Sequence, residues 1–217
     1  MMNPEGGRHN LRFALFSSGA FFSCEVMQAL IDQDFRPDLL VLPEYPPAAR
    51  TAEPDLGNIA VAPQRRLLAL AGKIDIVYTP AAQQQQCARL IGQSAIEFLL
   101  VACWPYLLDS IVIESAAKAA LNLHPSLLPR YRGPDPVARQ LAAGDTTFGV
   151  TLHRLNQRFD RGDIIAQAAL NHPDPKPRRE VLERLCARLG VDLFIDAIGR
   201  FPDWKPVAQS CQWSPTD

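Results

Sequence analysis

Residues 98–123 read FLLVACWPYLLDSIVIESAAKAALNL. The first part, Phe98–Ala102, is continuously apolar, which is typical of a strand buried on both faces of a sheet. A helical pattern follows at Ser110–Ala119, and Ala120–Leu123 is a second short apolar run. This order of strand, helix and strand predicts neighbouring parallel strands joined by a helical crossover.

The alternation continues on both sides of this unit. Further strands are predicted at Leu11–Phe16, Leu39–Leu42, Ile74–Tyr78, Val150–Leu155 and Ile164–Leu170, and further helices at Phe22–Leu30, Gln64–Leu70, Gln83–Ile91, Pro134–Ala143 and Arg179–Ile198. The stretch Pro46–Pro63 has no clear period and is predicted to be a long loop. The fold class is therefore α/β, a Rossmann-like, mostly parallel sheet with helices on both faces. The two late strands are expected to form an antiparallel pair.

Two parts of the chain are distinguished by their patterns. Residues 1–172 hold all the predicted strands, whereas residues 173–217 comprise a proline-punctuated linker, one amphipathic helix and a tail. The tail, Phe201–Asp217, is expected to lie on the surface as part of a short C-terminal helical extension.

Composition excludes several classes of protein. Hydrophobic residues make up 47% of the 217 residues, enough for a substantial core, and the net charge of -1 gives no general attraction to nucleic acid or to an anionic membrane. The five cysteines are scattered without a C-x-x-C pair, so we expect neither a bound metal nor disulfides, and a cytoplasmic protein. No apolar run is long enough to cross a bilayer, and no membrane association is expected.

Polar side chains follow the apolar run that ends at Leu123. Asn122 and His124 are two residues apart, so on a strand they point to the same face. They lie at the carboxyl edge of the predicted sheet, where α/β proteins bind ligands. A second polar cluster, Asp160–Asp163, occupies the bend between the two late strands. Asn122 and His124 are therefore candidate ligand-binding residues.

These segments resemble a known family. The chain has N-x-H-x-S-L-L-P from Asn122 to Pro129, then Arg132-Gly133, Gly149-Val150-Thr151, and D-x-G-D from Asp160 to Asp163. In this order the motifs resemble the 10-formyltetrahydrofolate-dependent formyltransferases, and most closely the N-terminal catalytic domain of methionyl-tRNA formyltransferases. The resemblance runs from about residue 11 to residue 170 and implies that residues 1–172 are a catalytic domain.

The resemblance implies 10-formyltetrahydrofolate as the formyl donor, an amine as the acceptor, and Asn122, His124 and Asp160 as the reactive centre. Asn122 would donate a hydrogen bond to the oxyanion that forms when the amine attacks the formyl carbon. His124 would stabilise the same charge or pass a proton to the leaving folate nitrogen, and Asp160 would assist the proton transfer. Physical chemistry supports these roles, because one preorganised donor contributes about 3–4 kcal/mol to such a reaction.

The resemblance also implies binding residues. The folate pocket corresponds to Val101, Ala102, Trp104, Tyr106 and Leu107, together with Asp163. This chain has Trp104-Pro105 where family members carry a small, glycine-containing segment.

On the acceptor side we expect Ser126, Arg130 and Arg132. Ser126 would alternatively brace its loop, and the two arginines would alternatively be surface charge. His153 is expected either to line the acceptor site or to lie on a solvated strand face.

The acceptor stays open among several classes. Glycinamide ribonucleotide transformylases carry a phosphate-binding turn after the first strand. The corresponding turn here, Ser17–Ser23, lacks the G-x-G-S-N sequence of that turn. Methionyl-tRNA formyltransferases carry a C-terminal barrel for which the residues after Leu170 are too few, so tRNA is not expected as a partner. Sugar-nucleotide formyltransferases share the core, and a small-molecule amine acceptor is therefore favoured. A non-catalytic folate-binding homologue is the remaining alternative, and the sequence gives no oligomeric state.

Overall fold

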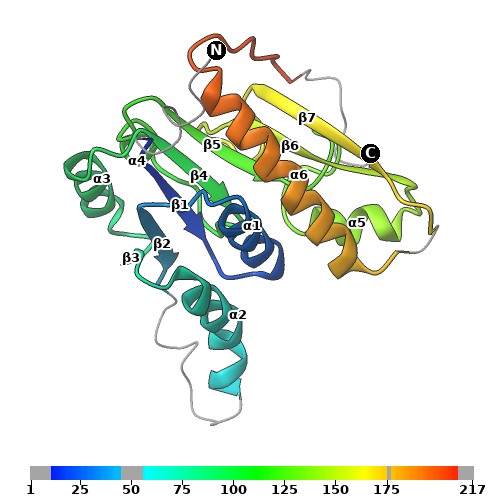
Figure 1. Ribbon diagram of the computed structural model, residues 1–217, viewed down its shortest axis with the longest axis horizontal. Coiled ribbons are helices and arrows are strands. Elements are labelled where there is room, and N and C mark those ends of the chain that lie inside the picture. Colours follow the sequence, from blue (N-terminus) through cyan, green and yellow to red (C-terminus); the bar gives the residue numbers. More distant parts are fainter. Residues whose placement is uncertain (1–10, 45–55, 175–176, 210–217) are drawn as a thin grey trace, which may run out of the picture.

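The computed structural model describes residues 11–44, 56–174 and 177–209 and contains one seven-stranded sheet (Figure 1). The strands are β1 (Phe13–Ser17), β2 (Leu39–Pro43), β3 (Asp75–Thr79), β4 (Phe98–Ala102), β5 (Ala119–His124), β6 (Thr147–Arg154) and β7 (Ile164–Asn171). Their order across the sheet is β3-β2-β1-β4-β5-β6-β7. Strands β1 to β5 are parallel, and β6 pairs antiparallel with both β5 and β7. The predicted fold class and the antiparallel late pair are confirmed.

Helices cover both faces of the sheet (Figure 1). They are α1 (Phe21–Asp32), α2 (Leu56–Ala71), α3 (Gln84–Gln93), α4 (Ser110–Ile113), α5 (Pro136–Ala142) and α6 (Arg179–Gly199). Alternate residues of β1 contact the two helical layers: Phe13 and Leu15 pack with α1 and α6, whereas Ala14 and Phe16 pack with α3 and α4. Burial on both faces explains why the central strands are apolar without alternation.

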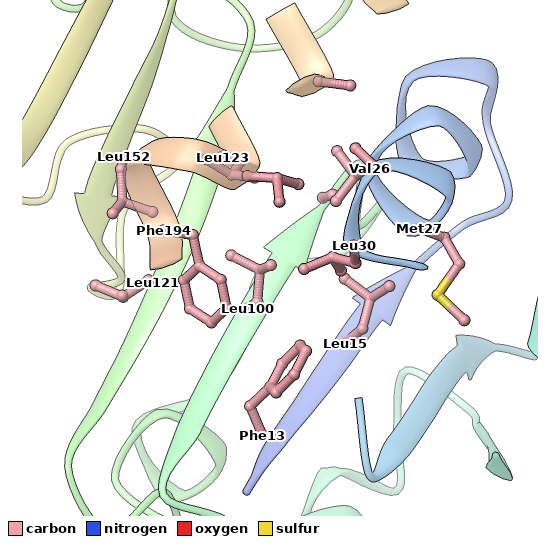
Figure 2. Packing of buried hydrophobic residues seen from close by; sticks show 14 of the residues in the cluster. Phe13, Leu15, Val26, Met27, Leu30, Leu100, Leu121, Leu123, Leu152 and Phe194 are labelled. Atoms are coloured by element: carbon pink, nitrogen blue, oxygen red, sulfur yellow. The ribbon is translucent and has the colours of Figure 1, made fainter. Parts of the chain in front are cut away.

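The larger core lies between the sheet, α1 and α6. Figure 2 shows Leu30 of α1 and Phe194 of α6 directed toward Leu15 and Leu100 of the central strands. The Phe13 and Phe194 rings have centroids 5.3 Å apart and an interplanar angle of 56°, an arrangement that favours aromatic attraction. Helix α6 therefore belongs to the same core as the strands. The division into a catalytic domain of residues 1–172 and an extension of residues 173–217 stays a prediction.

Two predicted boundaries are wrong. Helix α2 begins at Leu56, so the loop predicted as far as Pro63 is already helical over residues 56–63, while residues 46–55 lie outside the described chain. A proline inside a helix removes one backbone hydrogen bond and crowds the carbonyl four residues earlier, but α2 continues through Pro63. Helix α4 ends at Ile113 and not near residue 119. The amides of Ala117 and Lys118 donate to the carbonyls of Ile96 and Glu97, which draws this segment toward the sheet.

The described part of the predicted surface tail is mostly exposed, but one buried residue anchors it to the domain. Trp204 is only 9% exposed and joins the main core, and its indole Nε1 donates to the Ala197 carbonyl at 2.6 Å. Val207 forms an antiparallel bridge with Ile164 through two backbone hydrogen bonds of 2.8 and 2.9 Å. Aromatic burial and this bridge hold residues 201–209 against the domain, and residues 210–217 lie outside the described chain.

Among the described helices, none is long and apolar enough to cross a membrane.

Candidate functional site

A cavity of about 620 Å³ opens at the carboxyl edge of the sheet. It lies beside the ends of β1 and β4, which are neighbours although β2 and β3 separate them in the chain. Such a reversal of strand order is the usual ligand site of open α/β sheets. Three groups of residues line the cavity. The predicted catalytic residues Asn122, His124 and Asp160 form one wall, called the catalytic wall after that prediction. The aromatic wall consists of Val101, Cys103, Trp104, Tyr106 and Leu107, and the ionic wall of Asp135, Arg179 and Glu183.

Asp160 is the centre of the catalytic wall. Its Oδ1 accepts a hydrogen bond from Asn122 Nδ2 at 3.2 Å and lies 3.4 Å from His124 Nδ1. Its Oδ2 accepts from the Gly133 amide at 2.8 Å. The structure therefore brings the three residues of the predicted reactive centre together around one carboxylate.

The surroundings of Asp160 favour its ionised form. Burial alone would raise the pKa of this carboxyl, but His124, His153 and the Gly133 amide outweigh burial and lower the pKa to about 2. A carboxylate that accepts several hydrogen bonds in a low-dielectric site holds a fixed negative charge. Asp160 can thus stabilise a positive charge that appears on His124.

His124 is 5% exposed and is fixed by its other nitrogen. Nε2 lies 2.9 Å from the Tyr131 carbonyl, which can only accept, so Nε2 carries a hydrogen and Nδ1 is the nitrogen that gains or loses a proton. Burial lowers the pKa of His124, while the Asp160 carboxylate and the Tyr131 carbonyl act in the opposite direction. A proton on Nδ1 is therefore readily given up and faces a counter-ion while it is held.

His153 completes the network, and sequence reasoning did not place it there. It is 1% exposed, which rules out the solvated strand face, and it is not among the residues that line the cavity. Its Nδ1 donates to the Arg154 carbonyl at 2.8 Å, so Nε2 can accept from Asn122 Nδ2 at 3.0 Å. His153 sits opposite Asn122 in the β5–β6 ladder. Recognising that β5 pairs with β6 would have revealed it.

The turn that carries Asp160 has a demanding backbone. Asp160 has φ 51°, in the left-handed region that side chains rarely adopt. A Cβ on Gly162 would lie 1.7 Å from the Arg154 carbonyl oxygen, so only glycine permits this contact between the turn and β6. Cys103, Tyr131 and Asp135 also have positive φ, between 52° and 57°. Each of them lines the cavity or, in the case of Tyr131, holds His124.

Some of the predicted folate-binding residues line the cavity and others do not. Val101, Trp104, Tyr106 and Leu107 line the cavity, but Ala102 is buried within β4 and does not. Asp163 is exposed, and its carbonyl accepts the Arg154 amide at 2.9 Å, which suits a residue that braces the turn.

Trp104 departs from the family pattern and has an unusual environment. Its ring lies edge-on to Phe16 with centroids 5.1 Å apart and edge-on to Tyr106 at 6.2 Å. The indole Nε1 is buried and has no hydrogen-bond partner among the described residues. A buried donor without a partner is unfavourable.

The predicted acceptor residues lie outside the cavity lining. Ser126 is fully buried, and its hydroxyl donates to the Arg130 carbonyl at 2.7 Å, which braces the loop. Arg130 pairs with Asp145 at 3.0 Å. Arg132 donates to the Gln209 side chain at 2.6 and 2.9 Å. These side chains hold the loop that contacts His124.

The ionic wall was not foreseen. Glu183 is 4% exposed and accepts from Arg179 Nε at 2.6 Å, and Arg179 also pairs with Asp135 at 2.7 Å. Burial raises the pKa of Glu183, and the Arg179 cation only partly opposes it. The sequence does not distinguish this pair, because Arg179 and Glu183 have the i,i+4 spacing of an ordinary ion pair on a helix surface. Among the described residues, no group of three or more His, Cys, Asp or Glu side chains could hold a metal ion.

The fold is that of formyltransferases of known structure. Glycinamide ribonucleotide transformylase 1 from Symbiobacterium toebii superposes with a TM-score of 0.62 at 18% identity, covering 92% of this chain and 94% of its own. HypX from Aquifex aeolicus, solved in complex with tetrahydrofolic acid, superposes with a TM-score of 0.62 at 15% identity, covering 94% of this chain and 29% of its own. Identities this low establish the fold alone.

The sequence establishes the family. Residues 44–198 match the family described as formyl transferase, and the chain belongs to it. A methionyl-tRNA formyltransferase from Syntrophus aciditrophicus is 30% identical over 165 residues, covering 74% of this chain and 53% of the relative. One from Chloroflexus aggregans is 34% identical over 139 residues, covering 64% of this chain and 45% of the relative. The chain spans about half the length of these curated relatives.

These relatives correct one prediction. The expectation that tRNA is not a partner is contradicted, because curated relatives of this chain are methionyl-tRNA formyltransferases. That expectation used the net charge and the length of the chain. Net charge does not describe local surfaces, and the length of a chain that matches half of its relatives carries no information about their remaining part.

Proposed function

We propose that this protein transfers a formyl group from 10-formyltetrahydrofolate to the amino group of an acceptor. The observation that carries the proposal is the convergence of Asn122 and His124 on the Asp160 carboxylate at the wall of the main cavity. Family membership supplies the reaction class, and the geometry supplies donors, a proton carrier and a fixed counter-charge within about one hydrogen-bond length of each other.

The donor would bind against the aromatic wall. Trp104 and Tyr106 offer ring surfaces and Leu107 an apolar edge, which suit a flat pterin. The Nε1 of Trp104, which neighbouring atoms cover, would donate to a polar edge of that ring after a rotation of the indole. In this proposal the N10 formyl group points toward the catalytic wall, which borders the same cavity.

The reaction would proceed through a tetrahedral intermediate. The acceptor nitrogen forms a bond to the formyl carbon, and the formyl oxygen becomes an oxyanion. Asn122 Nδ2 would stabilise this oxyanion once it redirects one of the two N–H groups that it gives to Asp160 Oδ1 and His153 Nε2. The acceptor gives up one proton to His124 Nδ1, directly or through a water held by Asp160. His124 returns that proton to N10 as the carbon–N10 bond breaks, so the products are the formamide and tetrahydrofolate. Asp160 stabilises the imidazolium between the two transfers.

The names of the relatives favour methionyl-tRNA as the first acceptor to test. The purified chain would be incubated with 10-formyltetrahydrofolate and methionyl-tRNA, glycinamide ribonucleotide or an amino-sugar nucleotide, and formylated product would be measured by mass spectrometry. We expect product from one of these acceptors, and a strong loss in Asn122→Ala and His124→Ala with an unchanged circular dichroism spectrum. A His124→Ala variant with a near-normal rate would refute the mechanism. Absence of product from all three acceptors, with folate binding retained, would favour a non-catalytic folate-binding protein.

A further inference from the structure

We propose that Gln209, ten residues beyond the end of α6, is a positioning residue that holds the Asp160 turn against the loop around His124. The inference rests on the proposed function. It concerns a segment that follows the part of the chain matched by the family, which ends at residue 198.

The side chain of Gln209 uses both ends of its amide. Its Nε2 donates to the carbonyl of Asp160 at 3.0 Å and to the carbonyl of Gly162 at 2.7 Å. Its Oε1 accepts from Arg132 Nε at 2.9 Å and from Arg132 Nη2 at 2.6 Å. One amide therefore joins the Asp160 turn to the loop that contains Arg132.

These two segments share the task of fixing the catalytic pair. The loop supplies the Tyr131 carbonyl, which fixes His124, and the Gly133 amide, which donates to Asp160. The turn supplies the Asp160 carboxylate itself, from a backbone in the left-handed region. If loop and turn move apart, both the 2.8 Å Gly133 contact and the 3.4 Å contact between Asp160 and His124 lengthen together.

Gln209 is itself well anchored. Trp204 is buried in the main core, and Arg154 stacks over its ring with the guanidinium carbon 5.2 Å from the centroid. Val207 then bridges to Ile164, directly after the turn. The segment reaches the site from a rigid support, as a group that positions others requires. Gln209 does not line the cavity, so it acts through Asp160 and not on the substrate.

The test compares Gln209→Met and Gln209→Glu with a matched control. Gln209→Met removes all four hydrogen bonds at similar volume, and Gln209→Glu keeps the acceptor for Arg132 but turns a carboxylate oxygen toward the two carbonyls. The control is Gln33→Met, which removes a 2.7 Å hydrogen bond to Asp192 between α1 and α6. The readouts are kcat, KM for 10-formyltetrahydrofolate, the pH profile of kcat, the melting temperature, and an NMR titration of the His124 ring in each folded variant.

We expect both Gln209 variants to lower kcat by about 10- to 100-fold, the usual effect of a displacement near 1 Å, with KM changed less than about threefold. The pH profile and the His124 titration should shift, whereas Gln33→Met should change neither. A Gln209→Glu variant with wild-type kcat and an unshifted His124 titration would overturn the inference, and so would the same result for Gln209→Met. A wild-type chain without formyl transfer would refute the proposed function instead, and the NMR titration would still decide the role of Gln209.

Discussion

Asp160 and Glu183 are two carboxylates that line one cavity, and burial affects them in opposite ways. Their side chains are similarly covered, with 11% and 5% exposed. The pKa of Asp160 is lowered to about 2, because two histidines and the Gly133 amide outweigh burial. The pKa of Glu183 is raised, because burial outweighs its Arg179 partner.

The difference lies in the partners. Those of Asp160 are the buried His124 and His153 and the half-buried Asn122 and Gly133. They come from three segments, and none of them is paired with a second carboxylate among the described residues. Arg179 is half exposed and divides its charge between Glu183 and Asp135. A solvated and shared cation compensates burial less than several enclosed donors do. The catalytic wall therefore stabilises the ionised carboxylate of Asp160, whereas the ionic wall disfavours the ionised carboxylate of Glu183. A cationic or hydrogen-bonding ligand at the ionic wall would stabilise that carboxylate.

The largest expected effect is on catalysis, in Asp160→Asn. The amide keeps the size of the side chain but removes the charge that would stabilise protonated His124, so we expect turnover to fall by about 10²- to 10⁴-fold. The measurement is the rate of formamide formation under saturating donor, with Glu183→Gln as the matched carboxylate-to-amide control. A loss below about tenfold in Asp160→Asn would mean that the two walls do not differ in the way described.

A second prediction concerns acid stability. The folded-state pKa of Asp160, about 2, lies below its ordinary value of 3.8, so its ionised form stabilises the fold above pH 3.8, and that stability is lost as the pH falls toward 2. A shift of this size corresponds to about 2 kcal/mol. Urea unfolding of the wild type and Asp160→Asn between pH 2.5 and 6, at about half-unit steps, should show the gap in unfolding free energy closing toward acid pH. A gap that stays constant would contradict the prediction.

Glu183→Gln should show the opposite dependence and a smaller effect. The folded-state pKa of Glu183 lies above 4.5, so the fold favours the protonated form of this carboxyl. The stability that the protonated form contributes is fully present below pH 4.5 and is lost as the pH rises through the raised pKa. The variant should therefore gain unfolding free energy relative to the wild type as the pH rises above 4.5. Asp135→Asn, whose side chain is about half exposed, is the control. A relative loss in that range would show that Arg179 outweighs burial.

The smallest expected effect is that of Trp104→Phe on the aromatic wall. The change removes a buried donor without a partner among the described residues, and this gain offsets the smaller ring, so we expect the unfolding free energy to change by less than about 1 kcal/mol. Binding of a stable folate analogue should weaken by about fivefold, the loss of one hydrogen bond. Calorimetry measures both ligand affinity and its enthalpy. Unchanged affinity would place the pterin away from Nε1.

Local patterns predicted the fold well where burial is simple. Phe98–Ala102 and Leu39–Leu42 are buried on both faces, so their apolar runs identify strands directly. The start of α2 was missed because proline is a statistical breaker whose cost a helix can absorb. The role of Trp204 was missed because one aromatic residue among prolines has no period, and only tertiary contacts bury it.

The same distinction applies to the site. Asn122 and His124 lie two residues apart on one strand, so their common face follows from local geometry. Their contact with Asp160 was supplied by the family resemblance. His153, Glu183 and Gln209 reach the site through β-pairing, helix packing and a returning segment. These contacts join residues far apart in the chain, which one sequence without its relatives does not reveal.

The left-handed backbone at Cys103, Tyr131, Asp135 and Asp160 has a consequence for the evolution of this chain. Such a conformation costs roughly 1–2 kcal/mol at Cys103 and at Tyr131 and less at the two aspartates, and the sum is an appreciable part of the net stability of an ordinary domain. Glycine at these positions would relax the backbone while loosening the groups around the cavity. A laboratory selection for heat resistance alone should therefore accumulate glycine there and lose activity, whereas a selection for turnover should retain the strained residues.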